Sequence, residues 1–165
     1  MNCMVKAIAT LAILTVSGGL LSAWKNQNLQ IPINQKMAEY LYDRGLEKLG
    51  SQDYTGAIAD FNQVIRRQSS HYQAYTKRCV ARSQIGERQA AIADCDRAVQ
   101  INPKDGEARS QRANLRHSLG DKQGAIEDLQ RAASIYQQSG NIEQYQKCRN
   151  TKNIQKIKYR MAKYY

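Results

Sequence analysis

The sequence predicts an all-α fold: an α-solenoid of three helix-turn-helix repeats with a C-terminal capping helix and a separate N-terminal hydrophobic helix. Only two prolines occur among 165 residues, so few positions interrupt a helical hydrogen-bond ladder. A motif also recurs at a spacing of 34 residues, and a fixed period of that length is typical of stacked helical units. A chain of this size buries the core of one modest domain.

The N-terminal residues 1–25 are expected to form a signal peptide or a membrane anchor. Ala7 to Trp24 is a run of eighteen uncharged residues, which covers roughly 27 Å as a helix. Leu21-Ser22-Ala23 offers a cleavage site of the kind that ends a secretory signal. Trp24 and Lys25 would instead suit a retained helix at the bilayer interface. Either outcome exports the chain or holds it at a membrane on the extracytoplasmic side.

A linker is expected at residues 26–37, followed by the repeats at 38–140. The three repeats are predicted at 38–71, 72–105 and 106–139. Their second helices carry, in register, Ala57-Ile58-Ala59-Asp60, Ala91-Ile92-Ala93-Asp94 and Ala125-Ile126-Glu127-Asp128. Between the helices, Gly86-Glu87 and Gly120-Asp121 are typical of a helix stop followed by an acid at the start of the next helix.

Each repeat places an arginine and an aspartate at equal distances from the turn between its helices. The pairs are Arg44 with Asp60, Arg78 with Asp94, and Arg112 with Asp128. Antiparallel helices would bring the two members of each pair level, so we predict a ladder of ion pairs. Because exposed ion pairs contribute less than ~1 kcal/mol, we expect the ladder to set helix register more than to add stability.

The 34-residue unit resembles the tetratricopeptide repeat family over residues 38–139. The family's alanine and its bulky residue four positions later match Ala57 and Phe61, and Pro103 matches its closing proline. The first helices depart from the family, because Arg44 and its counterparts stand where leucine is frequent. The resemblance implies a protein-binding scaffold whose groove is built from the first helices.

Under this resemblance, polar and apolar residues of the first helices are expected to line the groove that holds the partner. They are Tyr42, Leu46, Leu49, Gln73, Thr76, Val80, Ser83, Gln84, Glu107, Ser110, Asn114 and His117. Family members that hold the carboxyl terminus of heat-shock chaperones use lysines, asparagines and an arginine at such positions. Only Asn114 is compatible with that clamp, so this partner class is not expected.

The C-terminal residues 141–165 are predicted to form a basic amphipathic capping helix and tail. Ile142, Tyr145 and Cys148 begin an apolar stripe spaced for one helical face. The tail concentrates basic side chains without any acid: Lys147, Arg149, Lys152, Lys156, Lys158, Arg160 and Lys163. An alternative function follows, in which the chain is a peripheral binder and this tail contacts anionic lipid or another polyanion. Nucleic acid is not the expected target of an exported chain.

No motif in the sequence indicates catalysis. His71 and His117 stand outside any catalytic pattern, and neither HExxH nor a glycine-rich phosphate loop occurs. We therefore expect no enzyme, no cofactor, no metal and no small-molecule substrate. The prediction is a non-enzymatic adaptor that binds a protein or peptide through the groove.

Two cysteines of the second repeat, Cys79 and Cys95, lie equally far from their turn. Export would permit a disulfide between them. We favour two reduced core residues, because free cysteine is among the most buried residue types.

Overall fold

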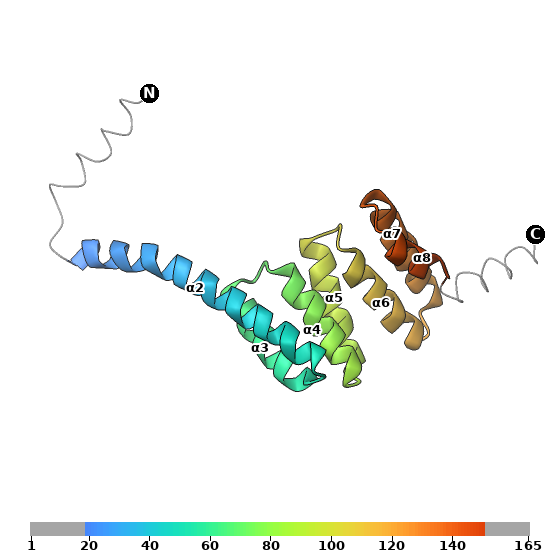
Figure 1. Cartoon of the computed structure of the whole chain (residues 1–165), viewed down its shortest axis with the longest axis horizontal. Coiled ribbons are helices and arrows are strands. Elements are labelled where there is room, and N and C mark those ends of the chain that lie inside the picture. The colour runs from blue at the N-terminus through green and yellow to red at the C-terminus, as the bar shows by residue number, and fades with distance from the viewer. Residues whose placement is uncertain (1–18, 151–165) are drawn as a thin grey trace, which may run out of the picture. The chain divides into compact units, whose positions relative to one another are not determined.

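The computed structural model describes residues 19–150, with side chains described from residue 33 onward. In this part of the chain all regular structure is helical, which confirms the predicted all-α class (Figure 1). The helices are α2 (Gly19–Gly50), α3 (Tyr54–Arg67), α4 (Tyr72–Gln84), α5 (Arg88–Ile101), α6 (Gly106–Ser118), α7 (Lys122–Gln138) and α8 (Ile142–Asn150). From residue 38 onward they form three antiparallel pairs, α2 with α3, α4 with α5 and α6 with α7, followed by α8.

The chain divides into two units between Met37 and Ala38. Helix α2 runs through residues 26–37, so the segment expected to be a linker is helical instead. Leu, Gln, Lys and Met in this segment have high helix propensity, and Pro32 is its single strong helix breaker. Among the described helices none combines the length and the apolar character needed to cross a bilayer. Most of the expected signal or anchor segment, residues 1–18, lies outside the described residues.

The turn inside each repeat contains one residue in the left-handed backbone region. Gly86 and Gly120 have φ of 84° and 91°, as predicted for glycine helix stops. The first repeat uses Gln52 at the same place, with φ of 66°, although a non-glycine residue is disfavoured there. Asp121 accepts a hydrogen bond from Gly124 N at 2.8 Å and so caps α7, whereas Glu87 makes no capping hydrogen bond at α5.

Small residues let the paired helices approach closely. Gly45 of α2 faces Phe61 of α3, and a Cβ added to Gly45 would lie 2.6 Å from the Phe61 ring. Buried alanines, which include Ala57, Ala91 and Ala113, take this role elsewhere. The core consists of three clusters of buried side chains, one for each successive helix pair.

The predicted ladder of ion pairs is confirmed in all three repeats. Arg44 Nε donates to Asp60 at 2.8 Å, Arg78 Nε to Asp94 at 2.8 Å, and Arg112 Nε to Asp128 at 2.7 Å. The expectation that these pairs are exposed is wrong, because the three aspartates are only 1%, 3% and 1% exposed. Each sits between two closely packed helices, so the pairs neutralise buried charge and do more than set register.

A second base reaches each ladder aspartate one turn further along the first helix. Lys48 Nζ lies 2.9 Å from Asp60, Arg82 Nη1 lies 2.8 Å from Asp94, and Arg116 Nη1 lies 2.9 Å from Asp128. These bases stand where the sequence departs from its family, and the carboxylates account for that departure.

The ladder arginines also connect neighbouring repeats. Arg78 Nη1 donates to Asn62 of α3 at 2.5 Å, and Arg112 Nη1 donates to Asp96 of α5 at 2.6 Å. Each of these two guanidinium groups therefore bonds to its own repeat and to the preceding repeat.

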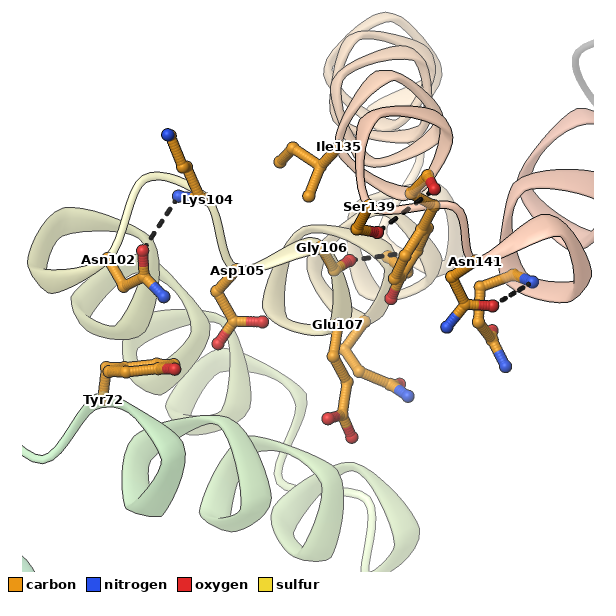
Figure 2. Close-up of a pocket in the computed structure, with 13 residues that line it drawn as sticks. Tyr72, Asn102, Lys104, Asp105, Gly106, Glu107, Ile135, Ser139 and Asn141 are labelled. Atoms are coloured by element: carbon orange, nitrogen blue, oxygen red, sulfur yellow. Dashed lines mark hydrogen bonds between the residues drawn. The ribbon is translucent and has the colours of Figure 1, made fainter.

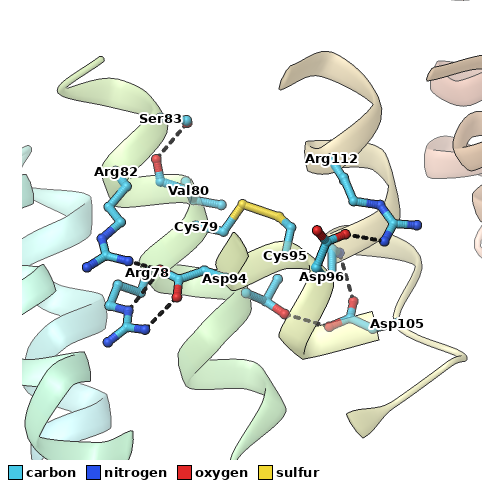
Figure 3. The surroundings of a disulfide bond; sticks show 12 residues. Arg78, Cys79, Val80, Arg82, Ser83, Asp94, Cys95, Asp96, Asp105 and Arg112 are labelled. Atoms are coloured by element: carbon cyan, nitrogen blue, oxygen red, sulfur yellow. Dashed lines mark hydrogen bonds and ion pairs between the residues drawn. A yellow bond between two sulfur atoms is a disulfide. The ribbon is translucent and has the colours of Figure 1, made fainter. Parts of the chain in front are cut away.

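Cys79 of α4 and Cys95 of α5 form a disulfide, with their Cα atoms 5.6 Å apart (Figure 3). The favoured prediction of two reduced cysteines is therefore wrong, and the alternative is correct. Both side chains are buried, as expected. Their equal offset from the turn places them level on antiparallel helices, at a Cα separation that a disulfide can span.

Helix α8 packs on α7 and follows the third repeat, as expected for a cap. Cys148 is buried there, while Ile142 is 56% exposed, so the predicted apolar stripe is only partly covered. The later members of that stripe lie outside the described residues.

Candidate protein-binding site

The first helices of the second and third repeats, α4 and α6, are neighbours. Lys77 of α4 forms an ion pair with Glu107 of α6, with Nζ 2.6 Å from Oε1. This pair joins two turns that carry several predicted groove residues. Lys77 itself was missed by the sequence analysis, although it lies one residue from Thr76.

The predicted groove residues on α2 belong largely to the core. Tyr42, Leu46 and Leu49 are half-buried and pack against the first core cluster. The Tyr42 ring lies 4.9 Å from the His71 ring and 5.8 Å from the Phe61 ring, between centroids. Burial raises the pKa of Tyr42 to about 12, and the negative charge of Glu107 raises it further. These side chains form one side of the first-helix surface and also support the fold.

The structure separates the remaining predicted groove residues into exposed, half-buried and buried ones. Gln73, Gln84, Asn114 and His117 are exposed, and Val80, Ser83, Glu107 and Ser110 are half-buried. Thr76 is a correction, because it is only 1% exposed and its hydroxyl donates to Asp105 at 2.6 Å. It positions another residue and does not face solvent.

A cavity of about 660 Å³ lies where α4, α6, α7 and α8 meet (Figure 2). Of the predicted groove residues, only Glu107 and Ser110 line it. The full lining is Tyr72, Asn102, Lys104, Asp105, Gly106, Glu107, Ser110, Gln111, Ile135, Tyr136, Ser139, Asn141 and Gln144.

The sequence contained a signal for part of this missed lining. Asn141 and Gln144 stand 34 residues after Glu107 and Ser110, so α8 repeats the register of a first helix. The groove prediction ended at His117 because the 34-residue period was not followed beyond the third repeat. Tyr72 and Tyr136 carry no comparable signal, because an isolated tyrosine in a helix is more often a packing residue.

Asp105 is the most buried acid of the cavity. It is 8% exposed, and its carboxylate accepts hydrogen bonds from Thr76 Oγ1 at 2.6 Å and from Ala108 N at 2.9 Å. The second bond caps the N-terminus of α6. Arg109, one turn later, donates its hydrogen bonds to the Pro103 carbonyl.

Tyr136 forms an aromatic wall of the cavity. A Cβ added to Gly106 would lie 2.8 Å from the Tyr136 ring, so the ring packs directly on the start of α6. Burial raises the pKa of Tyr136 to about 12, while a hydrogen bond with Ser110 acts in the opposite direction. The phenol therefore stays neutral and can donate or accept a hydrogen bond at neutral pH.

The histidines occupy unrelated positions. His71 Nδ1 accepts a hydrogen bond from Ala74 N at 3.2 Å and caps α4, and burial lowers the pKa of His71. His117 is exposed near the end of α6. Within residues 19–150, no three His, Cys, Asp or Glu side chains are grouped so that they could hold a metal ion.

Two of the predicted basic tail residues are described, and both lie exposed on α8. Lys147 forms an ion pair with Glu143 at 2.6 Å. Arg149 lies over the Tyr145 ring, 5.5 Å from its centroid. The other five, Lys152, Lys156, Lys158, Arg160 and Lys163, lie outside the described residues.

Solved structures with the same fold are domains of tetratricopeptide repeats and a chaperone. The TPR2B domain of yeast Sti1, in complex with pHsp70, is 22% identical, with a TM-score of 0.62 over 68% of this chain and 96% of that chain. The first TPR domain of Spaghetti (RPAP3), bound to the HSP90 peptide SRMEEVD, is 23% identical, with a TM-score of 0.65 over 74% and 94%. The type III secretion translocator chaperone SycD of Yersinia enterocolitica is 16% identical, with a TM-score of 0.71 over 76% and 88%. These similarities show the fold.

Family membership follows from a separate comparison. No curated protein matches the chain at a significant level. A family model described as tetratricopeptide repeat matches residues 42–106 and 80–140, which together span more than half of the sequence. The chain therefore belongs to the tetratricopeptide repeat family.

Proposed function

We propose that this protein is a non-enzymatic adaptor that holds a segment of a partner protein on its first-helix surface. The observation that carries the proposal is the cavity between α4, α6, α7 and α8, whose volume of about 660 Å³ suits the side chains of a bound segment. Glu107, Ser110, Asn141 and Gln144 repeat one register across α6 and α8, so a segment that crosses both helices meets equivalent positions. Family membership supports the same function, since stacked helix pairs present extended binding surfaces.

The proposed partner differs from the peptide bound to the Spaghetti domain. Asp105 and Glu107 line the cavity here, and like charges disfavour an acidic segment. We expect isothermal titration calorimetry with SRMEEVD to give no measurable heat of binding. Binding of that peptide at the cavity would contradict the assignment of an acidic site.

Site-directed photo-crosslinking in the native host tests the proposal. A benzoylphenylalanine at Gln144, which lines the cavity, should capture one defined protein. The matched control replaces Gln130, an exposed glutamine on α7 outside the cavity lining. The captured protein should then bind the purified chain, and Gln111→Arg should weaken that binding because it fills the cavity. Equal capture at both positions, or none at Gln144, would contradict the proposal.

We also propose that the chain folds in a compartment where disulfides form, outside the cytoplasm. The Cys79–Cys95 disulfide and the uncharged run Ala7–Trp24 support this location. Maleimide labelling of denatured protein, taken from the host under acid quench, should modify Cys148 but leave Cys79 and Cys95 unlabelled until a reductant is added. Labelling of all three without reductant would contradict it.

A further inference from the structure

The cavity contains a buried carboxylate without a counter-ion. Asp105 accepts hydrogen bonds from Thr76 Oγ1 and Ala108 N, which are both neutral donors. Among the described side chains, no Lys, Arg or His forms an ion pair with it, and Arg109 bonds to the Pro103 carbonyl. The hydrogen bonds satisfy the oxygen atoms, but the negative charge of Asp105 remains uncompensated.

The other buried carboxylates of the described chain are all neutralised. Asp60, Asp94 and Asp128 each lie within 3 Å of two basic side chains. A buried charge is costly unless an opposite charge accompanies it. Asp105 therefore lacks the partner that every comparable aspartate here has, and it lacks it where a cavity provides space for one.

The rest of the cavity suits a positive group. Tyr72 and Tyr136 are among its lining residues, and aromatic faces attract cations. The chain already uses such contacts, since the Arg78 guanidinium lies 5.4 Å from the centroid of the Tyr75 ring. Glu107 adds a second carboxylate, which Lys77 partly neutralises. The side chain of Lys104 is directed away from Asp105 and Glu107, so it does not fill the space (Figure 2).

We propose that this cavity is a subsite for a lysine or arginine side chain of the bound partner segment. Asp105 supplies the counter-ion, and Tyr72 and Tyr136 supply the aromatic walls. A long side chain suits the site because Asp105 lies below the surface, and only lysine and arginine carry a permanent positive charge at that reach. The subsite rests on the proposed function and assigns a chemical class to the segment that binds.

The test uses small probes, so it does not depend on knowing the partner. The full chain is titrated with N-acetyl-lysine methylamide and with its uncharged analogue N-acetyl-norleucine methylamide, and backbone amide shifts are followed by NMR. The lysine probe should shift the amides of residues 105–111 and 141–144, and the norleucine probe should not. Asp105→Asn should weaken the lysine probe about ten-fold, as expected for the loss of one charged contact.

The substitution Asp53→Asn is the matched control. Asp53 also caps a helix, because it accepts a hydrogen bond from Gly56 N at 2.9 Å, but it does not line the cavity. Asparagine replaces aspartate well at a helix cap, so both variants keep the fold and only Asp105→Asn should alter probe binding. Equal shifts from the two probes, or an unchanged affinity in Asp105→Asn, would overturn the subsite.

The two experiments separate the two proposals. Probe binding at Asp105 without any crosslink at Gln144 would support the subsite and contradict the adaptor function. A specific crosslink at Gln144 together with equal shifts from both probes would support the adaptor function and overturn the subsite.

Discussion

Two regions of this protein treat buried negative charge in opposite ways. Inside the helix pairs, Asp60, Asp94 and Asp128 are each held by two bases. Where α4, α6, α7 and α8 meet, Asp105 is held by neutral donors alone and lies in the wall of a cavity. The first arrangement closes the interior of a repeat, and the second leaves negative potential where a ligand can enter. Buried acids of one fold can thus serve stability in one place and recognition in another.

The largest expected effect comes from removing a ladder carboxylate. Asp128→Ala leaves Arg112 and Arg116 without their main partner, and the Arg112 side chain is only 10% exposed. Unpaired buried charge is strongly destabilising, so the free energy of unfolding should fall by about 4 kcal/mol in a urea titration. The control Asp121→Ala removes an exposed cap and should cost about 1 kcal/mol. A smaller loss for Asp128→Ala than for the control would contradict the role assigned to the ladder.

The next effect concerns the disulfide, which strengthens the interior of the second repeat alone. Changing Cys79 and Cys95 together to alanine removes a link between residues 16 positions apart. The free energy of unfolding should fall by about 3 kcal/mol, because the link restricts the unfolded chain. Urea midpoints of the oxidised protein, the reduced protein and the double variant measure this. If reduction leaves the midpoint unchanged, the disulfide is not part of the stable fold.

Acidification should weaken the ladder through Asp60. The hydrogen bond from Arg44 lowers the pKa of Asp60 below its ordinary value. A lowered folded-state pKa means that the stabilisation is complete above the unfolded value of about 3.9 and is lost as the pH falls through the folded value. Urea midpoints measured from pH 7 down to pH 2 should therefore fall at the acidic end. Asp60→Asn should flatten part of that slope, and an unchanged slope would contradict the assignment.

The smallest effect is expected at Asp105 itself. Asp105→Asn keeps an acceptor for Thr76 and a cap for α6, so the free energy of unfolding should change by less than about 0.5 kcal/mol. Urea denaturation of this variant beside Asp128→Asn sharpens the comparison, because the second change removes a charge that two arginines need. A loss at Asp105 as large as that at Asp128 would show that its charge also serves the fold.

Sequence reasoning was strongest where residues repeat. The 34-residue period gave the helix pairs, the turns at Gly86 and Gly120, and the Arg–Asp ladder, because periodicity and turn chemistry act locally. It was weaker where a contact joins different repeats. The hydrogen bond from Thr76 to Asp105 links residues 29 positions apart, and no local pattern shows that Thr76 is buried beneath the cavity. The redox state of Cys79 and Cys95 likewise depended on a separation of 5.6 Å that only packing sets.

The arginines that bond across repeats have a consequence for how the protein unfolds. Arg78 reaches Asn62, and Arg112 reaches Asp96, so each of these helix pairs loses a bond when its predecessor opens. In a linear array, such nearest-neighbour coupling makes unfolding cooperative, and a lesion in one unit spreads to the next. The acceptors always stand sixteen residues before their arginine, so the coupling travels with the unit. Duplication or loss of a whole 34-residue unit would preserve it, which gives arrays of this type a simple route to change length.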